Sequence, residues 1–528
     1  MQWDDPFRQG KNLASWSLID GADLSEDITL EADVVIVGSG AGGGVAAEIL
    51  SRSGRKVILI EEGSLKSSGD FRLKEAQAYL DLYQEGMTRS TQDGAICILQ
   101  GRTVGGSTTV NWTSSFRTPR ETLGYWGSEW GLEGCGVEEM APWFAKMEQR
   151  LSIEPWLSPN SNNQVLDRGC EALGWAHAPI PRNVKGCWNL GACGLGCPTN
   201  AKQSMLVTTI PAALDRGARL LHRVRVQELI IRKERVIGLV ADMIDRLGRV
   251  RPFRVTIHAQ QCILSAGAIG SPAVLLRSEG IPDPYRLIGT RTFLHPSVFG
   301  FAEFAEPIEG YQGAPQSSYS DHFQWRDGVE GPMGFKLEAT PMHPVFASVI
   351  MRGHGLTHWQ RMQNLPHMAG TLALLRDGFH PESTGGRVSL GTARQPVLDY
   401  RVGAFEMDGV RRAYLAMAEM FFAAGAQKVN LGHSDSEDYD SWAKAREAIA
   451  KFRYEPLRLR LGSAHVMGGC RMGSDPKRSV VNTKGRYHHL ENLYVFDGSL
   501  FPTSVGANPQ LSIYALVAKC ASELAASS

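Results

Sequence analysis

Apolar runs alternate with glycine-rich turns near the start of the chain. Residues 33–37 form a short run rich in β-branched side chains, which is typical of a strand buried on both faces. Glycines follow it, residues 44–50 have the pattern of a helix, and residues 56–60 form a second apolar run. This order predicts a βαβ unit of about 30 residues, and therefore a parallel sheet at the front of the chain.

The turn between the first strand and the helix has the residues that a phosphate needs. Gly38 permits a tight turn, Gly40 lets the backbone approach a pyrophosphate, and Gly43 allows close packing of helix on strand, with Ser39 in the same turn. Free N–H groups and the positive end of the helix dipole favour phosphate. Glu61, about 20 residues further on, suits ribose hydroxyls, and Glu62 is the alternative. The unit predicts a dinucleotide site but does not separate FAD from NAD.

Length and charge restrict the interpretation further. The chain has 528 residues, which favours two large domains or one domain with long insertions. Lys+Arg and Asp+Glu balance at 55 each, so charge gives no reason to expect a nucleic acid partner. Residues 1–25 lack the apolar core of a secretory signal, and the apolar stretch 413–426 is too short to span a bilayer, so we interpret it as a packed helix. We expect a cytoplasmic protein, with peripheral membrane association left open.

A second glycine-rich segment spans residues 101–112. Its Gly105 and Gly106 give close backbone access, and hydroxyl donors follow them. The segment closely resembles the first signature of the glucose-methanol-choline (GMC) oxidoreductase family, where it lies along FAD. The Asn-Trp-Thr variant at residues 111–113 is similar to the subgroup related to long-chain alcohol oxidases. The resemblance implies FAD as the cofactor, lined by Arg102, Gly106, Ser107, Asn111, Trp112 and Thr113.

Two later segments resemble the same family, in the family's order. Residues 261–266 have the pattern of a buried strand and precede a helix at 273–277, with Ser271 suited to its cap and Pro272 to its first turn. A strand at 493–496 leads to the C-terminal helix, which we expect at residues 510–525. The resemblance implies that further cofactor contacts come from Val226, Asp497, Gly498, Asn508 and Pro509.

Alcohol oxidation by a flavin transfers a hydride from the carbinol carbon to N5 and needs a base for the hydroxyl proton. Histidine has a suitable pKa, but most of the fourteen histidines will be surface or core residues. His465 begins a His-x-x-Gly-x-x-x-Met pattern that resembles the family's active-site histidine. The second position of the family pair falls on Asn508, which would orient the substrate. Asn508 followed by Pro509 is also a common start of a helix, with asparagine as its cap.

Three of the nine cysteines cluster in a glycine-rich loop, at Cys187, Cys193 and Cys197. Such a loop is a candidate metal site. Some GMC dehydrogenases carry a 3Fe–4S cluster in a similar stretch that begins with two adjacent cysteines, but Trp188 occupies the second of these positions here. We favour a loop without metal, and we expect no disulfide framework in a chain of this length.

The fold that these patterns predict is of the α/β class (α+β overall). We expect an N-terminal extension at 1–29, a discontinuous Rossmann-like FAD-binding domain, a lid or insertion at 116–199 and a substrate domain with an antiparallel sheet at 301–459. The FAD-binding domain would combine residues 30–115, 200–300 and 460–528. In the insertion, Trp126, Trp130, Trp143 and Trp156 are candidates for an apolar entrance, although aromatic packing is the commoner role.

The resemblance implies oxidation of a lipophilic, long-chain primary alcohol to its aldehyde, with His465 as base. Three alternatives stay open: a lyase of the same fold that keeps FAD without redox change, a flavin and 3Fe–4S dehydrogenase subunit that acts on sugars, and a non-catalytic flavin-binding subunit. The sequence does not decide whether oxygen, a quinone or a cytochrome accepts the electrons.

Overall fold

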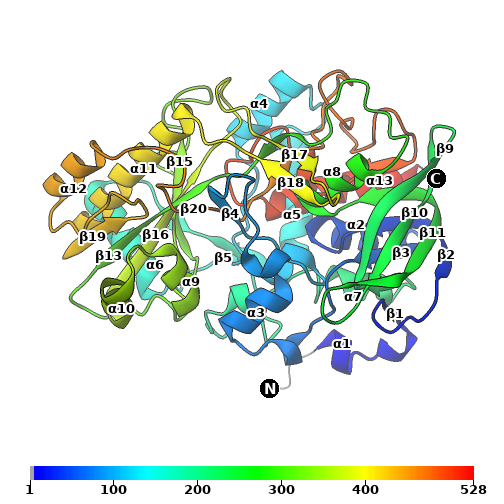
Figure 1. Cartoon of the computed structure of the whole chain (residues 1–528), viewed down its shortest axis with the longest axis horizontal. Coiled ribbons are helices and arrows are strands. Elements are labelled where there is room, and N and C mark those ends of the chain that lie inside the picture. The colour runs from blue at the N-terminus through cyan, green and yellow to red at the C-terminus, as the bar shows by residue number, and fades with distance from the viewer. Residues whose placement is uncertain (1–4, 528) are drawn as a thin grey trace.

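Two eight-stranded sheets organise the chain, which the computed structural model describes over residues 5–527 (Figure 1). The first sheet, on the right of Figure 1, contains the predicted βαβ unit, and the second, on the left, is mostly antiparallel. The chain passes between the two repeatedly, so both halves are built from segments distant in sequence. Within residues 5–527, no helix is long and apolar enough to cross a membrane.

The first sheet has the order β1-β8-β3-β2-β11-β10-β9, with β22 also paired to β11. From β1 to β11 the strands are parallel, while β11, β10 and β9 form an antiparallel meander. The long strand β11 forks, because its first half pairs with β10 and its last residues pair with β22. Its strands are β1 (Ser17–Asp20), β2 (Ile28–Val37), β3 (Val57–Glu61), β8 (Arg219–His222), β9 (Val224–Arg232), β10 (Arg235–Ile244), β11 (Val250–Leu264) and β22 (Leu493–Val495). The expected N-terminal extension thus contributes β1 to this sheet, and its residues 1–4 lie outside the described part.

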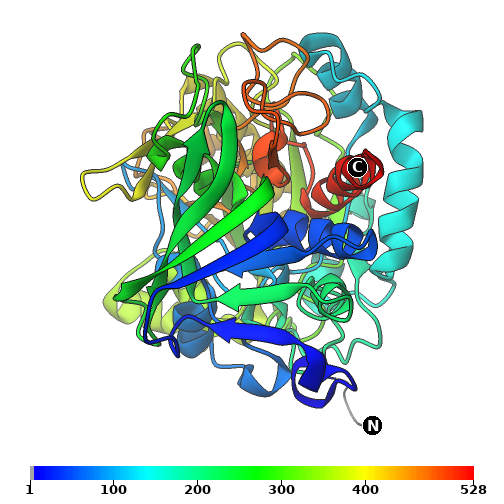
Figure 2. The ribbon, with the colours of Figure 1, turned by 90° about the vertical axis from the view of Figure 1, so that its right-hand side faces the viewer.

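Helices cover the first sheet, and α13 lies between α2 and α5 (Figure 2). Val34, Val35 and Ile36 of β2 are fully buried beneath them, as a doubly covered parallel strand requires. The helices in this half of the molecule are α2 (Ala41–Arg52), α4 (Arg120–Trp130), α5 (Val137–Arg150), α7 (Thr209–Leu214), α8 (Gly267–Arg277) and α13 (Gln510–Ala526). The elements predicted at 33–37, 44–50, 56–60 and 510–525 are therefore present, each with slightly different ends.

One predicted helix start is wrong. Helix α8 begins at Gly267, so Pro272 lies inside the helix and Ser271 is not its cap. The reason is a distant carboxylate: Asp497 accepts hydrogen bonds from the Gly267 N–H at 2.9 Å and the Ser271 hydroxyl at 2.5 Å, which starts the helix a turn earlier. Sequence proximity alone does not reveal this partner.

The second sheet has the order β4-β20-β13-β16-β15-β14-β6, with β19 also paired to β13. Alternate residues of β15 point to opposite faces: Phe335 and Leu337 enter the core beneath α6 and α11, so Lys336 and Glu338 take the other face. The apolar stretch 413–426 lies largely in α11 and is packed there, as predicted. The elements are β4 (Ile96–Ile98), β6 (Ala178–Pro179), β13 (Ser297–Glu303), β14 (Ser318–Ser320), β15 (Phe335–Ala339), β16 (Met368–Leu375), β19 (Lys428–Leu431), β20 (Leu461–Ser463), α6 (Ser161–Leu173), α11 (Ala404–Ala423) and α12 (Trp442–Ile449).

Smaller elements complete the molecule. A four-stranded sheet has the order β18-β17-β12-β21, and β5 pairs with β7. Three helices, α3, α9 and α10, lie along the lower edge in Figure 1. The bounds are β5 (Ile153–Pro155), β7 (Pro181–Asn183), β12 (Thr290–Phe293), β17 (Gly386–Leu390), β18 (Pro396–Asp399), β21 (Met467–Gly468), α1 (Pro6–Gln9), α3 (Glu75–Leu82), α9 (Pro344–Ile350) and α10 (Gly355–Gln363).

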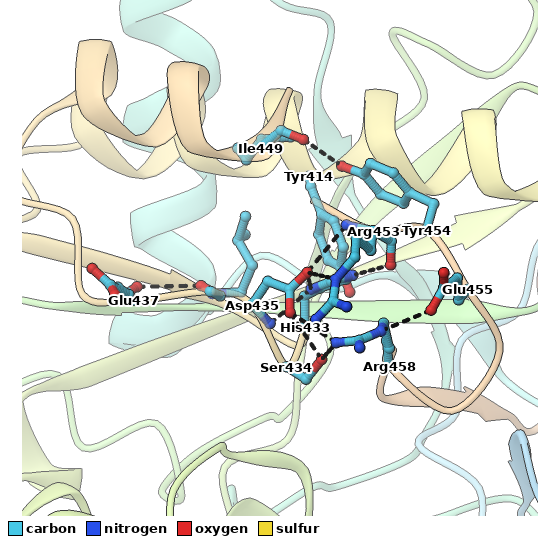
Figure 3. A network of polar contacts seen from close by, with 12 residues as sticks. Tyr414, His433, Ser434, Asp435, Glu437, Ile449, Arg453, Tyr454, Glu455 and Arg458 are labelled. Atoms are coloured by element: carbon cyan, nitrogen blue, oxygen red, sulfur yellow. Dashed lines mark hydrogen bonds and ion pairs between the residues drawn. The ribbon is translucent and has the colours of Figure 1, made fainter. Parts of the chain in front are cut away.

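A polar network closes the outer end of the second sheet (Figure 3). The buried His433 ring stacks on Phe452 with centroids 4.5 Å apart, and its Nδ1 accepts the Asp435 N–H at 3.0 Å. Its Nε2 therefore carries the proton and donates to the Arg453 carbonyl at 3.2 Å. Arg458 pairs with Asp435 at 3.0 Å. His433 is therefore neutral, and both of its ring nitrogens are used in hydrogen bonds that hold this part of the fold together.

Candidate active site

A cavity of about 700 Å³ takes its wall from both halves of the chain. It lies at the carboxyl ends of β2 and β3, where ligands bind in parallel sheets. Almost all predicted site residues meet on this wall, although they are spread over nearly 500 positions of sequence. They are Gly38, Ser39, Gly40, Glu61, Arg102, Gly106, Ser107, Asn111, Trp112, Thr113, Val226, His465, Asp497, Gly498, Asn508 and Pro509. Gly43 is absent from the described lining residues.

The first glycine-rich turn shows three different requirements for glycine. Gly38 has a φ of +99°, which other residues rarely adopt. A Cβ on Gly43 would lie 1.8 Å from the Gly38 carbonyl oxygen, so this glycine serves the packing of α2 on β2. A Cβ on Gly40 would meet only Gly106, at 3.8 Å, so Gly40 leaves the backbone open to the cavity.

The two acids after β3 have different surroundings. Glu62 pairs with Arg102 at 3.2 Å and Arg225 at 3.1 Å. Burial alone would raise the pKa of Glu62, but these two guanidinium groups outweigh it and lower the pKa to about 2. Glu61 has no cationic partner within the described chain; it accepts hydrogen bonds from Ser39 and Gly63, and burial raises its pKa. Glu61 is thus the acid that keeps capacity for a ribose.

The second glycine-rich segment lies directly on the first. A Cβ on Gly106, which has a φ of +53°, would come within 2.7 Å of the Gly40 Cα. Lys202, buried below the segment, donates to the carbonyls of Thr109 at 2.6 Å and Asn111 at 2.9 Å. Burial lowers the pKa of Lys202 to about 8. The segment is therefore fixed from below and meets the cavity with backbone and small side chains.

Three helices begin at the cavity: α2 and α13 have no side-chain cap in the described chain, whereas the first N–H of α8 is bound by Asp497. Their first residues line the wall, so unpaired backbone N–H groups and positive dipole ends converge there. An anionic cofactor satisfies this arrangement, and the open backbone at Gly40 leaves room for its phosphates. The residues present fit FAD.

His465 lines the cavity and contacts a second histidine. Its Nδ1 lies 3.1 Å from the Nδ1 of His295, which is fully buried. The Asp377 carboxylate accepts the backbone N–H groups of Leu294 and His295, at 2.9 and 3.0 Å, and so stabilises His295 at a φ of +48°. Burial, and after it the positive charge of Lys336, lower the pKa of His465 to about 3. The pair is therefore neutral at ordinary pH.

Asn508 belongs to a second buried polar group. The Lys336 ammonium lies 3.3 Å from Glu338 Oε1 and 3.5 Å from Asn508 Oδ1, while Asn508 Nδ2 donates to Glu338 Oε2 at 3.2 Å. The ammonium also lies 2.9 Å from the ring centroid of Phe116 and 4.4 Å from that of Tyr319. Burial lowers the pKa of Lys336 to about 8 and raises that of Glu338. Asn508 does not cap α13, because the cap position is Pro509.

Four residues near the site were missed from the sequence: Lys202, His295, Lys336 and Glu338. A signal existed for two of them. Residues 335–339 alternate apolar and charged side chains, so a lysine and a glutamate two positions apart must share one face of a strand. His295 and Lys202 had no such signal, because their partners lie far away in sequence.

The three clustered cysteines and the four tryptophans proposed for an entrance are absent from the described lining of the cavity. The described residues 5–527 contain no group of three or more His, Cys, Asp or Glu side chains that could hold a metal ion. Cys193 accepts a hydrogen bond from Arg182 at 3.4 Å, and burial raises the pKa of Cys187. Among the described lining residues, none of the tryptophans proposed for an entrance appears; Trp126, for example, stacks on Phe501 with centroids 5.2 Å apart.

Family models and curated relatives match most of the chain. Two GMC oxidoreductase models match residues 79–297 and 381–517, and an FAD-binding domain model matches residues 33–95. An uncharacterised GMC-type oxidoreductase of Mycobacterium tuberculosis is 30% identical over 503 residues, covering 94% of this chain and 76% of the relative. A long-chain-alcohol oxidase of Arabidopsis thaliana is 29% identical over 514 residues, covering 92% of this chain and 66% of that protein.

Solved structures share the fold. Formate oxidase of Aspergillus oryzae superposes with a TM-score of 0.68 at 17% identity, over 95% of this chain and 99% of the other. Pyridoxine 4-oxidase superposes with a TM-score of 0.67 at 18% identity, over 93% and 98%. The mixed α/β fold predicted from the sequence, with FAD as cofactor, is thereby confirmed. The chain belongs to the GMC oxidoreductase family and is an FAD-dependent oxidoreductase.

Proposed function

We propose that this enzyme oxidises a lipophilic primary alcohol to the aldehyde, with His465 as the base. The observation that carries the proposal is the pairing of two polar groups on one cavity wall: His465, engaged through Nδ1 with His295, and Asn508, engaged with Lys336 and Glu338. FAD, when bound, supplies the acceptor for the hydride of the carbinol carbon, and the glycine-rich turns with Glu61 and the starts of α2, α8 and α13 would hold it.

The histidine pair determines which nitrogen takes the proton. A hydrogen bond between two Nδ1 atoms contains one proton. When it belongs to His465, the ring's Nε2 has a free lone pair and accepts the hydroxyl proton of the substrate. His295 then accepts at Nδ1 and bears its own proton on Nε2. His295 acts here as a positioning residue for the base.

Asn508 orients the substrate oxygen. Its amide oxygen faces the Lys336 ammonium and its NH2 group faces the Glu338 carboxylate. The reverse orientation would oppose like partial charges at both ends. One amide hydrogen points to Glu338, which leaves the other for the substrate oxygen. The hydroxyl thus accepts from Asn508 and donates to His465, a geometry that aligns the carbinol hydrogen for transfer.

The apolar surroundings support a lipophilic substrate. Trp112 on the cavity wall has its ring centroid 6.3 Å from that of Phe346, which belongs to a separate cluster of buried apolar side chains under α9. The cluster contains six buried methionine and leucine residues, three of them on β16, and flexible side chains of this kind adapt to an alkyl chain. Relatives in Arabidopsis that bear the name long-chain-alcohol oxidase add weight to this choice.

The test is anaerobic reduction of the purified, FAD-loaded enzyme by a panel of decan-1-ol, benzyl alcohol and glucose. We expect decan-1-ol to bleach the visible flavin bands fastest and to yield decanal. Bleaching by glucose alone would show that the substrate is a sugar and not a lipophilic alcohol, while the enzyme would still be an oxidoreductase. Intact flavin bands with every alcohol would contradict alcohol oxidation and favour a lyase of this fold.

A further inference from the structure

Helices α9 and α10 expose large apolar side chains. Helix α9 buries Phe346, Ala347 and Ile350 but leaves Val345 and Val349 exposed. Of the nine described residues of α10 none is buried, and Leu356 and Trp359, three positions apart on one side of the helix, are 68% and 58% exposed. We call Val345, Val349, Leu356 and Trp359 the docking face. A nine-residue helix is marginal in water by itself, so a surface that covers this face would stabilise it.

The charges around the docking face are mostly positive, and one acid beside α10, Asp438, is paired with Arg361 of that helix at 2.7 Å. Residues 339–376 contain no Asp or Glu, although Arg352 lies between the two helices and His354 and His358 lie on or beside α10. Helix α3, which packs against α9, is preceded by the exposed Arg72 and Lys74. Arg72, Lys74 and Arg352 form no ion pair within residues 5–527. Apolar side chains that include tryptophan, surrounded by unpaired cations, complement the surface of an anionic lipid layer.

A second acid near the docking face, Glu75, is also engaged. The Glu75 carboxylate of α3 accepts the N–H groups of Val345 and Phe346, at 2.8 and 2.9 Å. These bonds cap α9 and join the two helices. The carboxylate therefore serves the helix start and does not oppose the cations at the margin.

The docking face lies close to the cavity. The inner side of α9 carries Phe346, whose ring is in contact distance of Trp112 on the cavity wall. Phe346 also packs against Phe299 of the second sheet, with centroids 6.4 Å apart. One helix layer thus separates the docking face from the cavity at Trp112, and α3, α9 and α10 lie together along one edge of the molecule (Figure 1).

We propose that the docking face binds an anionic lipid surface, from which a lipophilic alcohol reaches the cavity past α9. The delivery of substrate rests on the proposed function, whereas the binding of lipid does not. Trp359 and Leu356 enter the interfacial region, Val345 and Val349 follow, and Arg72, Lys74 and Arg352 contact headgroup phosphates. A second copy of this chain is the competing occupant of the same face.

The test is co-sedimentation of the FAD-loaded full chain with vesicles of phosphatidylcholine alone or mixed equally with phosphatidylglycerol. The variant is Val349→Ser/Leu356→Ser/Trp359→Ser. The matched control is Val137→Ser/Leu247→Ser, at the start of α5 and in the β10–β11 turn, where the two side chains are 49% and 76% exposed and absent from the described lining of the cavity. A separate Arg352→Gln variant isolates one charge. Flavin content and light scattering are recorded for each protein.

We expect wild type and control to bind the anionic vesicles, with weaker binding to phosphatidylcholine alone. Binding should fall about tenfold or more in the triple variant, and by a smaller factor in Arg352→Gln. Wild type that stays in the supernatant, or a triple variant that binds as wild type does, would overturn the proposal. A wild-type dimer that the triple variant converts to monomer would assign the face to a second copy instead. Vesicle binding is measured without any oxidation step. The protein can therefore bind vesicles even if decan-1-ol does not reduce its flavin, and decan-1-ol can reduce the flavin even if the protein does not bind vesicles.

Discussion

Replacing Lys336 by methionine should disable the orientation of Asn508 while leaving the fold intact. The ammonium is 3% exposed at the side-chain level and lies against the rings of Phe116 and Tyr319. Methionine has a similar length, and its thioether packs well on aromatic rings. The perturbation therefore removes one buried charge and little volume.

The magnitude follows from the ion-pair distance. At 3.3 Å, and with an effective dielectric constant of about 20, Lys336 stabilises the Glu338 carboxylate by about 5 kcal/mol. Burial already raises the pKa of Glu338, so without the lysine this side chain takes up a proton at neutral pH. A protonated Glu338 donates its O–H to the Asn508 amide oxygen, which turns a carbonyl toward the substrate. Losing one hydrogen-bond donor at the reacting oxygen costs about 2–3 kcal/mol, roughly 30- to 150-fold in rate.

The assay is anaerobic stopped-flow reduction of the flavin by decan-1-ol across pH, with the Lys519→Met variant as control. Lys519 pairs with Glu523 at 2.8 Å on α13, nearer the surface than the Lys336–Glu338 pair, and it is absent from the described lining of the cavity. We expect a lower limiting reduction rate in Lys336→Met, with a smaller change in the alcohol dissociation constant. Since Lys336 also lowers the pKa of His465, its removal should shift the acidic limb of the rate profile to higher pH. A purely structural role would not move this limb.

Two results would refute the reasoning. The first is a Lys336→Met enzyme with full FAD content and a reduction rate within threefold of wild type. The second is an equal loss of rate in Lys519→Met, which would assign the effect to general destabilisation.

Four further predictions concern the same residues. His465→Gln should retain FAD but reduce it about 10²- to 10⁴-fold more slowly, and wild-type rates would remove the base assignment. His295→Asn should slow reduction about tenfold without changing flavin content. An unchanged reduction rate would show that His295 does not position the proton of His465. Gly106→Ala should lose FAD, measured as the ratio of visible to ultraviolet absorbance, because its Cβ would lie 2.7 Å from the Gly40 Cα. Stability should fall from pH 7 to pH 5.5. Burial lowers the pKa of His433, that of His222 to about 4 and that of His465 to about 3, so below about pH 6.5 these three sites bind more protons in the unfolded chain than in the folded one. Asp377, whose pKa burial raises to about 6, opposes this trend at a single site. An unfolding midpoint in urea that is equal or higher at pH 5.5 would contradict this sign.

The sequence was sufficient where local pattern and chemistry agree. The apolar run 33–37, the three glycines after it and Glu61 predict their own arrangement, because each depends on neighbours within about 30 residues. His465 was identified from a short motif, and the structure places it on the cavity wall. The start of α8 was predicted wrongly because Asp497, 230 positions away, supplies the bonds that begin the helix.

The polar groups behind the site could not be predicted for a related reason. The contacts of Asn508 with Lys336 and Glu338 join β15 to the start of α13 across 172 and 170 positions. Residue spacing shows that Lys336 and Glu338 share one face of a strand, but not what that face meets. His295 likewise reaches His465 only because Asp377 stabilises a left-handed backbone turn. Such contacts are a property of tertiary packing.

The central claim is that an alcohol gives its carbinol hydrogen to the flavin with His465 as base. The most direct measurement is the anaerobic rate of flavin bleaching with decan-1-ol and with its 1,1-dideuterated form, alongside detection of decanal. The account predicts complete bleaching, stoichiometric decanal and a clearly slower reaction with the deuterated alcohol, all lost in His465→Gln. Flavin that stays oxidised with either alcohol, or bleaching that forms no aldehyde, would contradict it.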